Sequence, residues 1–164
     1  MERAVVLVEG TSDRIALETL ARRLGRDLAA EGVAVEAIGG AQAIRRALAR
    51  HAGARLVGLV DAGEAGAFRQ ALDDVFVCDP DLEGELIRAL GAAEVLRVLE
   101  ANGDVGPFRT LQKQPSWRGR PVEEQLRRFM GSGGSRKIRY ARFLVDALEL
   151  DRVPRPLGAV LAAV

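Results

Sequence analysis

Three short apolar runs in the sequence each end at an acidic residue. A carboxylate that directly follows a buried parallel strand faces the crevice at the carboxyl edge of the sheet, where ligands bind in open α/β folds. Several carboxylates gathered there repel one another, and binding a divalent cation relieves that repulsion. Ligands that are all oxygen favour Mg²⁺ or Mn²⁺ over zinc. The acidic residues at or just after the ends of these runs are Glu9, Asp61, Asp81 and Glu83.

Asp13 is a further candidate, because it follows Glu9 by four residues across the turn from the first strand into the first helix. With Glu9 and Asp61 it could present oxygen atoms around a small cavity. An acidic residue in the first turn of a helix is also a favourable cap, whatever else it does. The candidate metal ligands are therefore Glu9, Asp13, Asp61, Asp81 and Glu83.

Strands and helices alternate over the first 80 residues, and this alternation places the acidic residues. Strands are predicted over residues 4–8, 33–38, 55–60 and 75–78, with helices over 11–24, around 44–48 and over 64–72. Repeated βα units predict an α/β, Rossmann-like fold with a four-stranded parallel sheet, helices on its faces and right-handed crossovers. The carboxyl ends of all four strands then meet at one edge.

After residue 81 the strand pattern stops and helices follow. They are predicted over residues 82–90, 92–101, 122–130 and 136–148, with a loop at 112–121 and a glycine-rich break at 131–135. A chain of 164 residues is long enough for one compact domain. We expect a core of residues 1–101 and a helical C-terminal extension, residues 102–164, packed on it.

The net charge of +1 hides an uneven distribution of charge along the chain. In residues 1–104, 12 arginines and 18 acidic residues give a net charge of −6. In residues 105–142, ten basic residues and two acidic residues give a net charge of +8. The first part is typical of a cation-binding protein and the second of a protein that binds a polyanion.

The strand followed by Glu9-Gly10-Thr11-Ser12-Asp13 resembles the first signature of the Toprim domain, the metal-dependent module of topoisomerases, bacterial primases and OLD (overcoming lysogenization defect) nucleases. Asp61 resembles the first acid of the DxD motif of that domain, and Asp81-Leu82-Glu83 resembles the further acidic pair of OLD-type Toprim domains. The resemblance covers residues 4–90 well and the tail beyond Asn102 more loosely. The whole chain resembles short stand-alone Toprim proteins of actinobacteria.

Lys137 is one of only two lysines, beside 22 arginines. An ammonium group is a compact charge that fits next to a phosphate oxygen or a leaving group. The resemblance implies that Lys137 matches the lysine that OLD nucleases place near the scissile phosphate. Its neighbours Arg136, Arg139 and Arg142 are predicted to follow a nucleic-acid backbone.

The sequence departs from the family at the DxD motif, where it has Asp61-Ala62-Gly63-Glu64 instead of a second aspartate at position 63. Three outcomes are open. Glu64 could replace the missing ligand, Glu9 and Asp61 could hold a single metal with more water, or the site could bind metal poorly and no longer catalyse.

The resemblance implies Mg²⁺-dependent or Mn²⁺-dependent phosphodiester chemistry on nucleic acid, most plausibly DNA cleavage or nicking by hydrolysis. In this interpretation Asp61 with Glu9 or Asp13 holds one metal, and Asp81 with Glu83 assists a second. Glu9 is alternatively a general acid or base, and Lys137 stabilises developing negative charge. Two other interpretations are a non-catalytic module that binds nucleic acid, and a small nucleotide phosphohydrolase or transferase.

Other sequence features set expectations for partners and compartment. No G-x-x-x-x-G-K-S/T sequence is present, so ATP control of the kind exerted in OLD nucleases would have to come from an ATPase partner protein. The single cysteine, Cys78, is predicted to be a buried core residue, and the single histidine, His51, a helix-end residue rather than a zinc ligand. Trp117 is predicted to anchor its loop on the core. With no apolar run near the roughly 18 residues that span a bilayer, a cytoplasmic protein that does not enter membranes is expected.

Overall fold

A four-stranded parallel sheet forms the centre of the structure, a computed structural model that describes residues 2–164. Met1, the first residue of the predicted core, lies outside the described residues. The strand order is β2-β1-β3-β4, which confirms the predicted α/β fold. The strands are β1 (Ala4–Val8), β2 (Val33–Ala37), β3 (Arg55–Asp61) and β4 (Asp74–Cys78).

The register of the strands brings their carboxyl ends to one edge of the sheet. Val8 at the end of β1 lies opposite Ala37 of β2 and Leu59 of β3, and Asp61 lies opposite Cys78 of β4. The chain leaves β1 for β2 on one side and later returns to β3 on the other side. The carboxyl ends of β1 and β3 therefore flank a topological switch point, the usual ligand crevice of such sheets.

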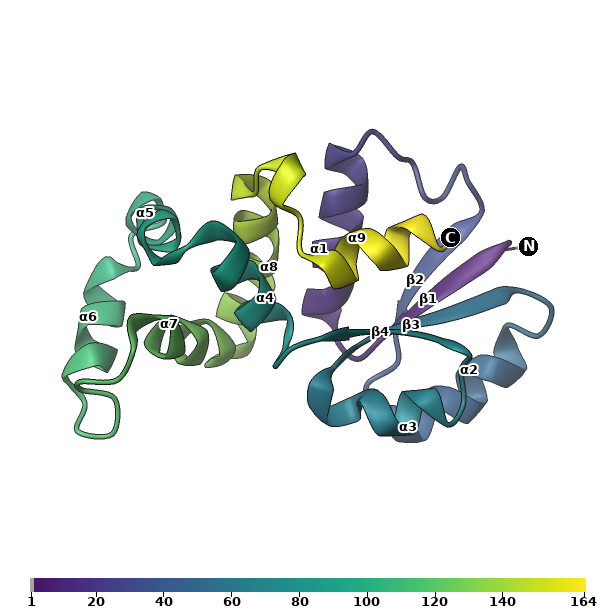
Figure 1. Cartoon of the computed structure of the whole chain (residues 1–164), viewed down its shortest axis with the longest axis horizontal. Coiled ribbons are helices and arrows are strands. Elements are labelled where there is room, and N and C mark those ends of the chain that lie inside the picture. The colour runs from purple at the N-terminus through teal and green to yellow at the C-terminus, as the bar shows by residue number, and fades with distance from the viewer. Residues whose placement is uncertain (1) are drawn as a thin grey trace.

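Helices cover both faces of the sheet (Figure 1). On one face lie α1 (Thr11–Arg23) and α9 (Arg155–Ala162), and on the other lie α2 (Ile44–Arg50) and α3 (Ala65–Arg69). Successive residues of a strand point to opposite faces, so Val6 and Val8 join the core on the α1 side while Val5 and Leu7 pack towards α2 and α3. This two-sided burial explains why β1 is a continuous apolar run. Short 3₁₀ turns, Ala41–Ala43 and Ala62–Glu64, precede α2 and α3.

The helices that follow β4 extend away from the sheet before the chain returns to it (Figure 1). They are α4 (Leu82–Leu90), α5 (Ala92–Ala101), α6 (Val105–Lys113), α7 (Val122–Gly131) and α8 (Gly134–Ala147), followed by a 3₁₀ turn at Leu150–Arg152. The sequence did not predict α6 or α9. The long helix α8 packs along α1, and α9 packs against β3 and β4. Residues beyond 101 therefore contact the sheet and its first helix directly.

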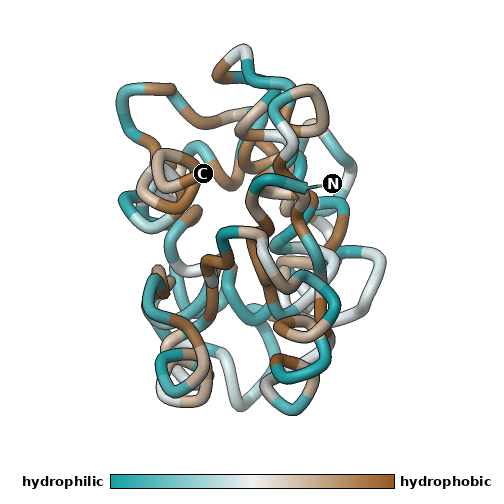
Figure 2. Tube along the Cα trace, turned by 90° about the vertical axis from the view of Figure 1, so that its right-hand side faces the viewer, coloured by the Kyte–Doolittle hydropathy of each residue, from teal (hydrophilic) through white to brown (hydrophobic). Residues whose placement is uncertain are grey.

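One hydrophobic core joins the sheet to these helices. Val6 of β1 and Leu17 of α1 belong to the same buried cluster as Phe108, Phe129 and Tyr140. Hydrophobic and hydrophilic positions are interspersed along the tube in Figure 2, and the buried apolar residues of the helices face the cores on the two sides of the sheet. Within residues 2–164, no helix is long and apolar enough to cross a membrane.

Two predictions about single residues are confirmed. Cys78 is only 1% exposed at the end of β4, where it is part of the core. Trp117 packs against that core, and its backbone carbonyl accepts a hydrogen bond of 2.8 Å from the side chain of Gln125. The guanidinium groups of Arg120 and Arg128 lie 5.0 and 5.9 Å from the centre of its ring. Trp117 thus anchors its loop.

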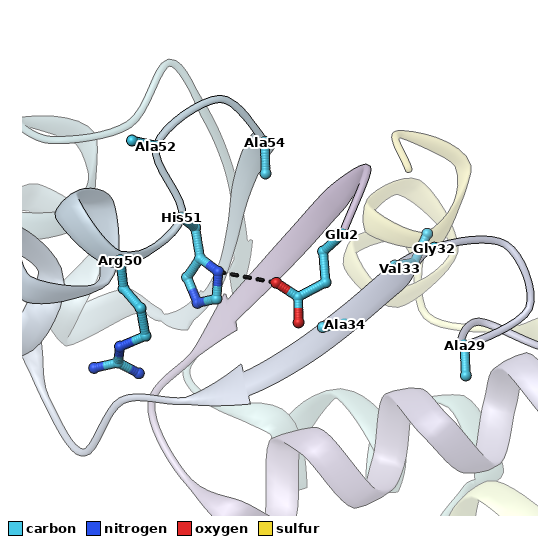
Figure 3. Close-up of a pocket in the computed structure, with 9 residues that line it drawn as sticks. All are labelled: Glu2, Ala29, Gly32, Val33, Ala34, Arg50, His51, Ala52 and Ala54. Atoms are coloured by element: carbon cyan, nitrogen blue, oxygen red, sulfur yellow. Dashed lines mark ion pairs between the residues drawn. The ribbon is translucent and has the colours of Figure 1, made fainter.

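His51 connects the end of α2 to the sheet, beside a hollow at the amino-terminal edge (Figure 3). Its Nδ1 atom lies 3.1 Å from a carboxylate oxygen of Glu2, and its Nε2 atom lies 2.5 Å from one of Glu36. Arg50 also pairs with Glu36. Because this hollow is at the opposite edge from the acidic residues that end the strands, we assign His51 to holding α2 in place, in line with its predicted position at a helix end.

Candidate functional site

Asp61, at the end of β3, lies within the electrostatic reach of the four other acidic residues that the sequence singled out. The pKa of its carboxyl group is raised to about 7. Burial is the largest cause, and the charges of Asp13, Glu9, Asp81 and Glu83 add to it. These five residues, here called the acid cluster, come from the ends of β1, β3 and β4 and from the helices that follow β1 and β4. The fold therefore brings all five predicted ligands to the carboxyl edge of the sheet.

Asp13 serves two roles in the acid cluster. Its Oδ2 atom accepts a hydrogen bond of 2.9 Å from the backbone N–H of Gly10, so it caps the turn from β1 into α1. Burial raises the pKa of Asp13 to about 6, although this hydrogen bond lowers it, and Glu83 and Glu9 add to the increase. Asp13 therefore caps the turn, as expected from the sequence, and also belongs to the acid cluster.

Asp81 and Glu83 begin α4, and each is engaged by another part of the protein. Asp81 accepts a hydrogen bond of 2.9 Å from the backbone N–H of Gly84 and pairs with Nε of Arg127 on α7 at 2.8 Å. Glu83, only 8% exposed, lies 3.6 Å from Nζ of Lys137 on α8. In the sequence Arg127 is only one of the ten basic residues of 105–142, and no local signal could have shown its pairing with Asp81, which lies 46 residues away.

Lys137 reaches the acid cluster from the second turn of α8, where its Nζ atom lies 3.6 Å from Glu83. Its burial opposes the charged form, but the carboxylates of Glu83, Asp13 and Asp61 outweigh this effect and raise its pKa. The ammonium group therefore stays protonated at neutral pH. A fixed positive charge beside five acidic residues is suited to receive a phosphate oxygen.

The chemistry of the acid cluster fits a divalent cation that prefers oxygen ligands. All five side chains are carboxylates, and the pKa of Asp61 is raised first by its burial and then by the negative charges of its four neighbours. Within the described residues 2–164, however, no three acidic, histidine or cysteine side chains lie close enough together to hold one ion. Three of the five carboxylates are turned to protein partners: Asp13 to Gly10, Asp81 to Gly84 and Arg127, and Glu83 to Lys137.

Position 63 has room for the side chain that the Toprim motif would place there. A Cβ atom added to Gly63 would meet nothing within 4 Å, and Gly63 is not among the glycines with a positive φ. The neighbouring Glu64 lines a cleft that it shares with Glu9. The glycine is therefore not needed for packing or for the backbone conformation, and an acidic side chain already lies nearby.

The three arginines predicted to bind nucleic acid are placed differently. Arg136 turns inward: its guanidinium carbon lies 3.9 Å from the centre of the Phe129 ring, and its Nη1 atom donates to the backbone carbonyls of Phe129 and Ser132 at 3.2 and 3.4 Å. Arg139 and Arg142 are exposed on α8, with only long contacts of 3.7 Å to Asp104 and Asp146. Arg136 thus joins α8 to α7, while the other two are accessible to a ligand.

Tyr140 is buried and is not available as a nucleophile. Its side chain is 1% exposed, and its hydroxyl donates a hydrogen bond of 2.6 Å to Asp104. Burial and this hydrogen bond raise its pKa, so the phenolate is not formed at neutral pH. Chemistry at the acid cluster therefore does not use this tyrosine, which lies within α8.

The parallel sheet has the order β2-β1-β3-β4, with acidic residues at its strand ends, and this is the arrangement that the resemblance to a Toprim domain implies. The family profile described as "Overcoming lysogenization defect protein-like, TOPRIM domain" matches residues 2–62, and this part of the chain therefore resembles the Toprim domain of the OLD family. A search of curated proteins found no match.

Solved structures of OLD proteins share this fold along almost the whole chain. The C-terminal region of the Burkholderia pseudomallei OLD protein has a TM-score of 0.72 and 17% identity, with 99% of this chain and 96% of that chain covered. The C-terminal region of the Xanthomonas campestris pv. campestris OLD protein has a TM-score of 0.71 and 21% identity, with 98% and 91% covered. The likeness thus includes the helices after β4, beyond the residues that the family profile matches.

Proposed function

We propose that this protein is a nuclease of the Toprim type that hydrolyses phosphodiester bonds of DNA with the help of Mg²⁺ or Mn²⁺. The observation that carries the proposal is the acid cluster itself, in which burial and four neighbouring carboxylates raise the pKa of Asp61 to about 7 while Lys137 pairs with Glu83. The resemblance to OLD proteins, which include nucleases, supports DNA as the substrate.

In the proposed mechanism Asp61 would hold one cation together with Glu9 or Asp13, with water as the other ligands, and Asp81 with Glu83 would assist a second cation or orient its waters. When bound, the cation supplies neutralisation of the phosphate charge and activation of water. Lys137 holds its proton and stabilises the negative charge that develops on the phosphate oxygens. Asp81 is now paired with Arg127, and Glu83 with Lys137. Each carboxylate would have to leave its cationic partner before it could contact an ion.

A non-catalytic module that binds nucleic acid is the second candidate. The same two ion pairs favour it, because cationic side chains already neutralise part of the acid cluster. Gly63 favours it too, since one acidic ligand of the Toprim motif is missing. A measurement that separates binding from cleavage is therefore needed to choose between the two.

The proposal is tested by nicking of supercoiled plasmid DNA with Mn²⁺ or Mg²⁺. We expect Glu9→Ala and Lys137→Ala each to lower the nicking rate by about 10- to 100-fold, because one loses a ligand and the other a stabilising charge. As controls, Glu94→Ala and Arg97→Ala remove the same charges from an exposed ion pair on α5 and should nick like the wild type. DNA binding without any metal-dependent nicking by the wild type would leave the binding module as the function.

Restoring an aspartate at position 63 should strengthen metal binding. The Gly63→Asp variant adds a carboxylate where there is open space, and we expect the affinity for Mn²⁺, measured by calorimetric titration, to rise by about tenfold. Gly66→Asp is a matched control, because Gly66 also has open space and the variant adds the same charge three residues further on. Equal affinities for the two variants would mean that position 63 does not face the cation.

A further inference from the structure

A second cleft opens beside the acid cluster, on the side of the sheet away from Lys137. Its volume is about 610 Å³, and it lies between Glu9, the turn after β2 and the 3₁₀ turn that precedes α3. Lys137 reaches the acid cluster from α8, which packs along α1 on one face, whereas this cleft is bordered by α2 on the other face (Figure 1). The lining residues that matter here are Glu9, Gly39, Gly40, Gln42, Arg46 and Glu64.

Arg46 is the cationic residue among them. It is exposed on α2, and among residues 2–164 it forms neither an ion pair nor a side-chain hydrogen bond, although Glu9 and Glu64 line the same cleft. By contrast, Arg50 on the same helix pairs with Glu36. A guanidinium group presents five donors in a planar fork that matches the oxygens of a phosphate. Arg46 therefore keeps its full donor capacity for a ligand.

The other wall of the cleft is bare backbone. Gly39 and Gly40 have φ values of +78° and +138°, conformations that favour glycine, and a Cβ atom added to either would meet nothing within 4 Å. The N–H of Gly39 donates a hydrogen bond of 2.8 Å to the carbonyl oxygen of Glu9, which fixes this turn to the end of β1. A ligand can thus approach the backbone closely at a constant position relative to the acid cluster.

We propose that this cleft holds the sugar-phosphate backbone of the nucleic-acid strand next to the bond that is cut, with Arg46 contacting a phosphate. The inference rests on the proposed function, since it names the path of the same substrate. With Lys137 on one side of the acid cluster and Arg46 on the other, a strand that crosses the acidic edge meets a cation on each side. Arg46 is therefore a residue that selects a polynucleotide over an isolated phosphate ester.

The test is binding of a fluorescent single-stranded oligonucleotide, followed by anisotropy in EDTA at low salt, so that cleavage does not enter. We expect Arg46→Ala to weaken binding by about five- to tenfold and to reduce the slope of log affinity against log salt by about 0.7. Arg46→Lys should retain most of the affinity. The matched control is Arg45→Ala, which removes the same charge from the neighbouring residue of α2, outside the cleft.

Equal losses of affinity in Arg46→Ala and Arg45→Ala would overturn the inference, because the effect would then be one of net charge. Unchanged affinity in both variants would overturn it as well. These outcomes do not depend on nicking. If the wild type fails to cleave plasmid DNA but Arg46→Ala alone loses affinity, the proposed function falls and the strand path stands. If the wild type cleaves and the two variants bind alike, the strand path falls and the function stands.

Discussion

The Asp61→Asn variant is expected to lose at least about 100-fold in metal-dependent nicking, and at the same time to be more stable than the wild type above pH 7 in a chelator. The two effects have one cause. Burial penalises the negative charge of Asp61 most, and the charges of the four other members of the acid cluster add to this penalty, which a bound cation would relieve. The asparagine amide has the same shape but no charge, so it removes the charge that would bind the cation and also the unfavourable placing of a negative charge among the other carboxylates.

The direction of the pH effect follows from the pKa of Asp61, which is raised from 3.8 to about 7 in the folded protein. Between these values the folded state binds more protons than the unfolded state, so the stability that Asp61 contributes is present below about pH 4 and is lost as the pH rises through about 7. Because Asp61 is partly exposed and water screens it, we expect the variant to gain about 1–2 kcal/mol at pH 8 rather than the full value of the shift.

Urea denaturation in EDTA at pH 4 and pH 8 measures this gain. Asp61→Asn should match the wild type at pH 4 and exceed it at pH 8, whereas Asp73→Asn, at an exposed position, should match it at both. Adding Mn²⁺ at pH 8 should then stabilise the wild type but hardly the variant, as expected for an ion that binds only the folded state. A variant that is less stable than the wild type at pH 8 would mean that Asp61 is held by favourable contacts instead of repulsion.

The sheet and the gathering of the acid cluster could be predicted from the sequence because both depend on local patterns. A strand buried on both faces must be a continuous apolar run, as in β1, and parallel strands must end at the same edge. The positions of Glu9 and Asp61 could therefore be predicted from where their strands end. Apolar residues that recur at helical spacing likewise located α1 to α5, α7 and α8.

The missed helices have weak local signals. In α6, Gly106 and Pro107 follow the first residue, and in α9, Pro156 lies at the second residue with Gly158 after it. Proline in the first turn of a helix is well tolerated because its missing N–H has no partner there in any case, but in the sequence it reads as a helix breaker. Only packing against the core decides in favour of the helix.

The particular partners of distant side chains could not be predicted. Arg127 with Asp81 and Lys137 with Glu83 join helices that are far apart in the chain. Arg136 reads as one more basic residue of a nucleic-acid surface, yet its stacking on Phe129 turns it towards α7. The direction in which such an arginine side chain points depends on which aromatic ring lies within reach. That is known only once the helices are packed together.

Phe129 connects the positioning of Lys137 to the stability of the whole molecule. It is 2% exposed, packs edge-on against Phe108 with ring centres 5.5 Å apart, and carries the guanidinium of Arg136 on its ring. Its cluster of buried residues continues through Tyr140 and Leu17 to β1. If residues 1–101 and 102–164 form one compact domain, as proposed, damage at Phe129 must destabilise the sheet as well as α7 and α8.

We therefore expect Phe129→Ala to lower the free energy of unfolding by about 3–5 kcal/mol, in a single cooperative transition, because it leaves a large cavity and removes the partner of Arg136. Phe129→Leu, which keeps most of the volume, should cost less than about 1.5 kcal/mol. Urea denaturation followed both by Trp117 fluorescence, which reports on the helices after β4, and by far-ultraviolet circular dichroism measures this. Coincident transitions would support one domain, whereas a Trp117 signal lost well before the rest would show that these helices unfold separately. Since α8 carries Lys137, that second result would also mean that the charge beside the acid cluster is held by a part of the protein that opens on its own.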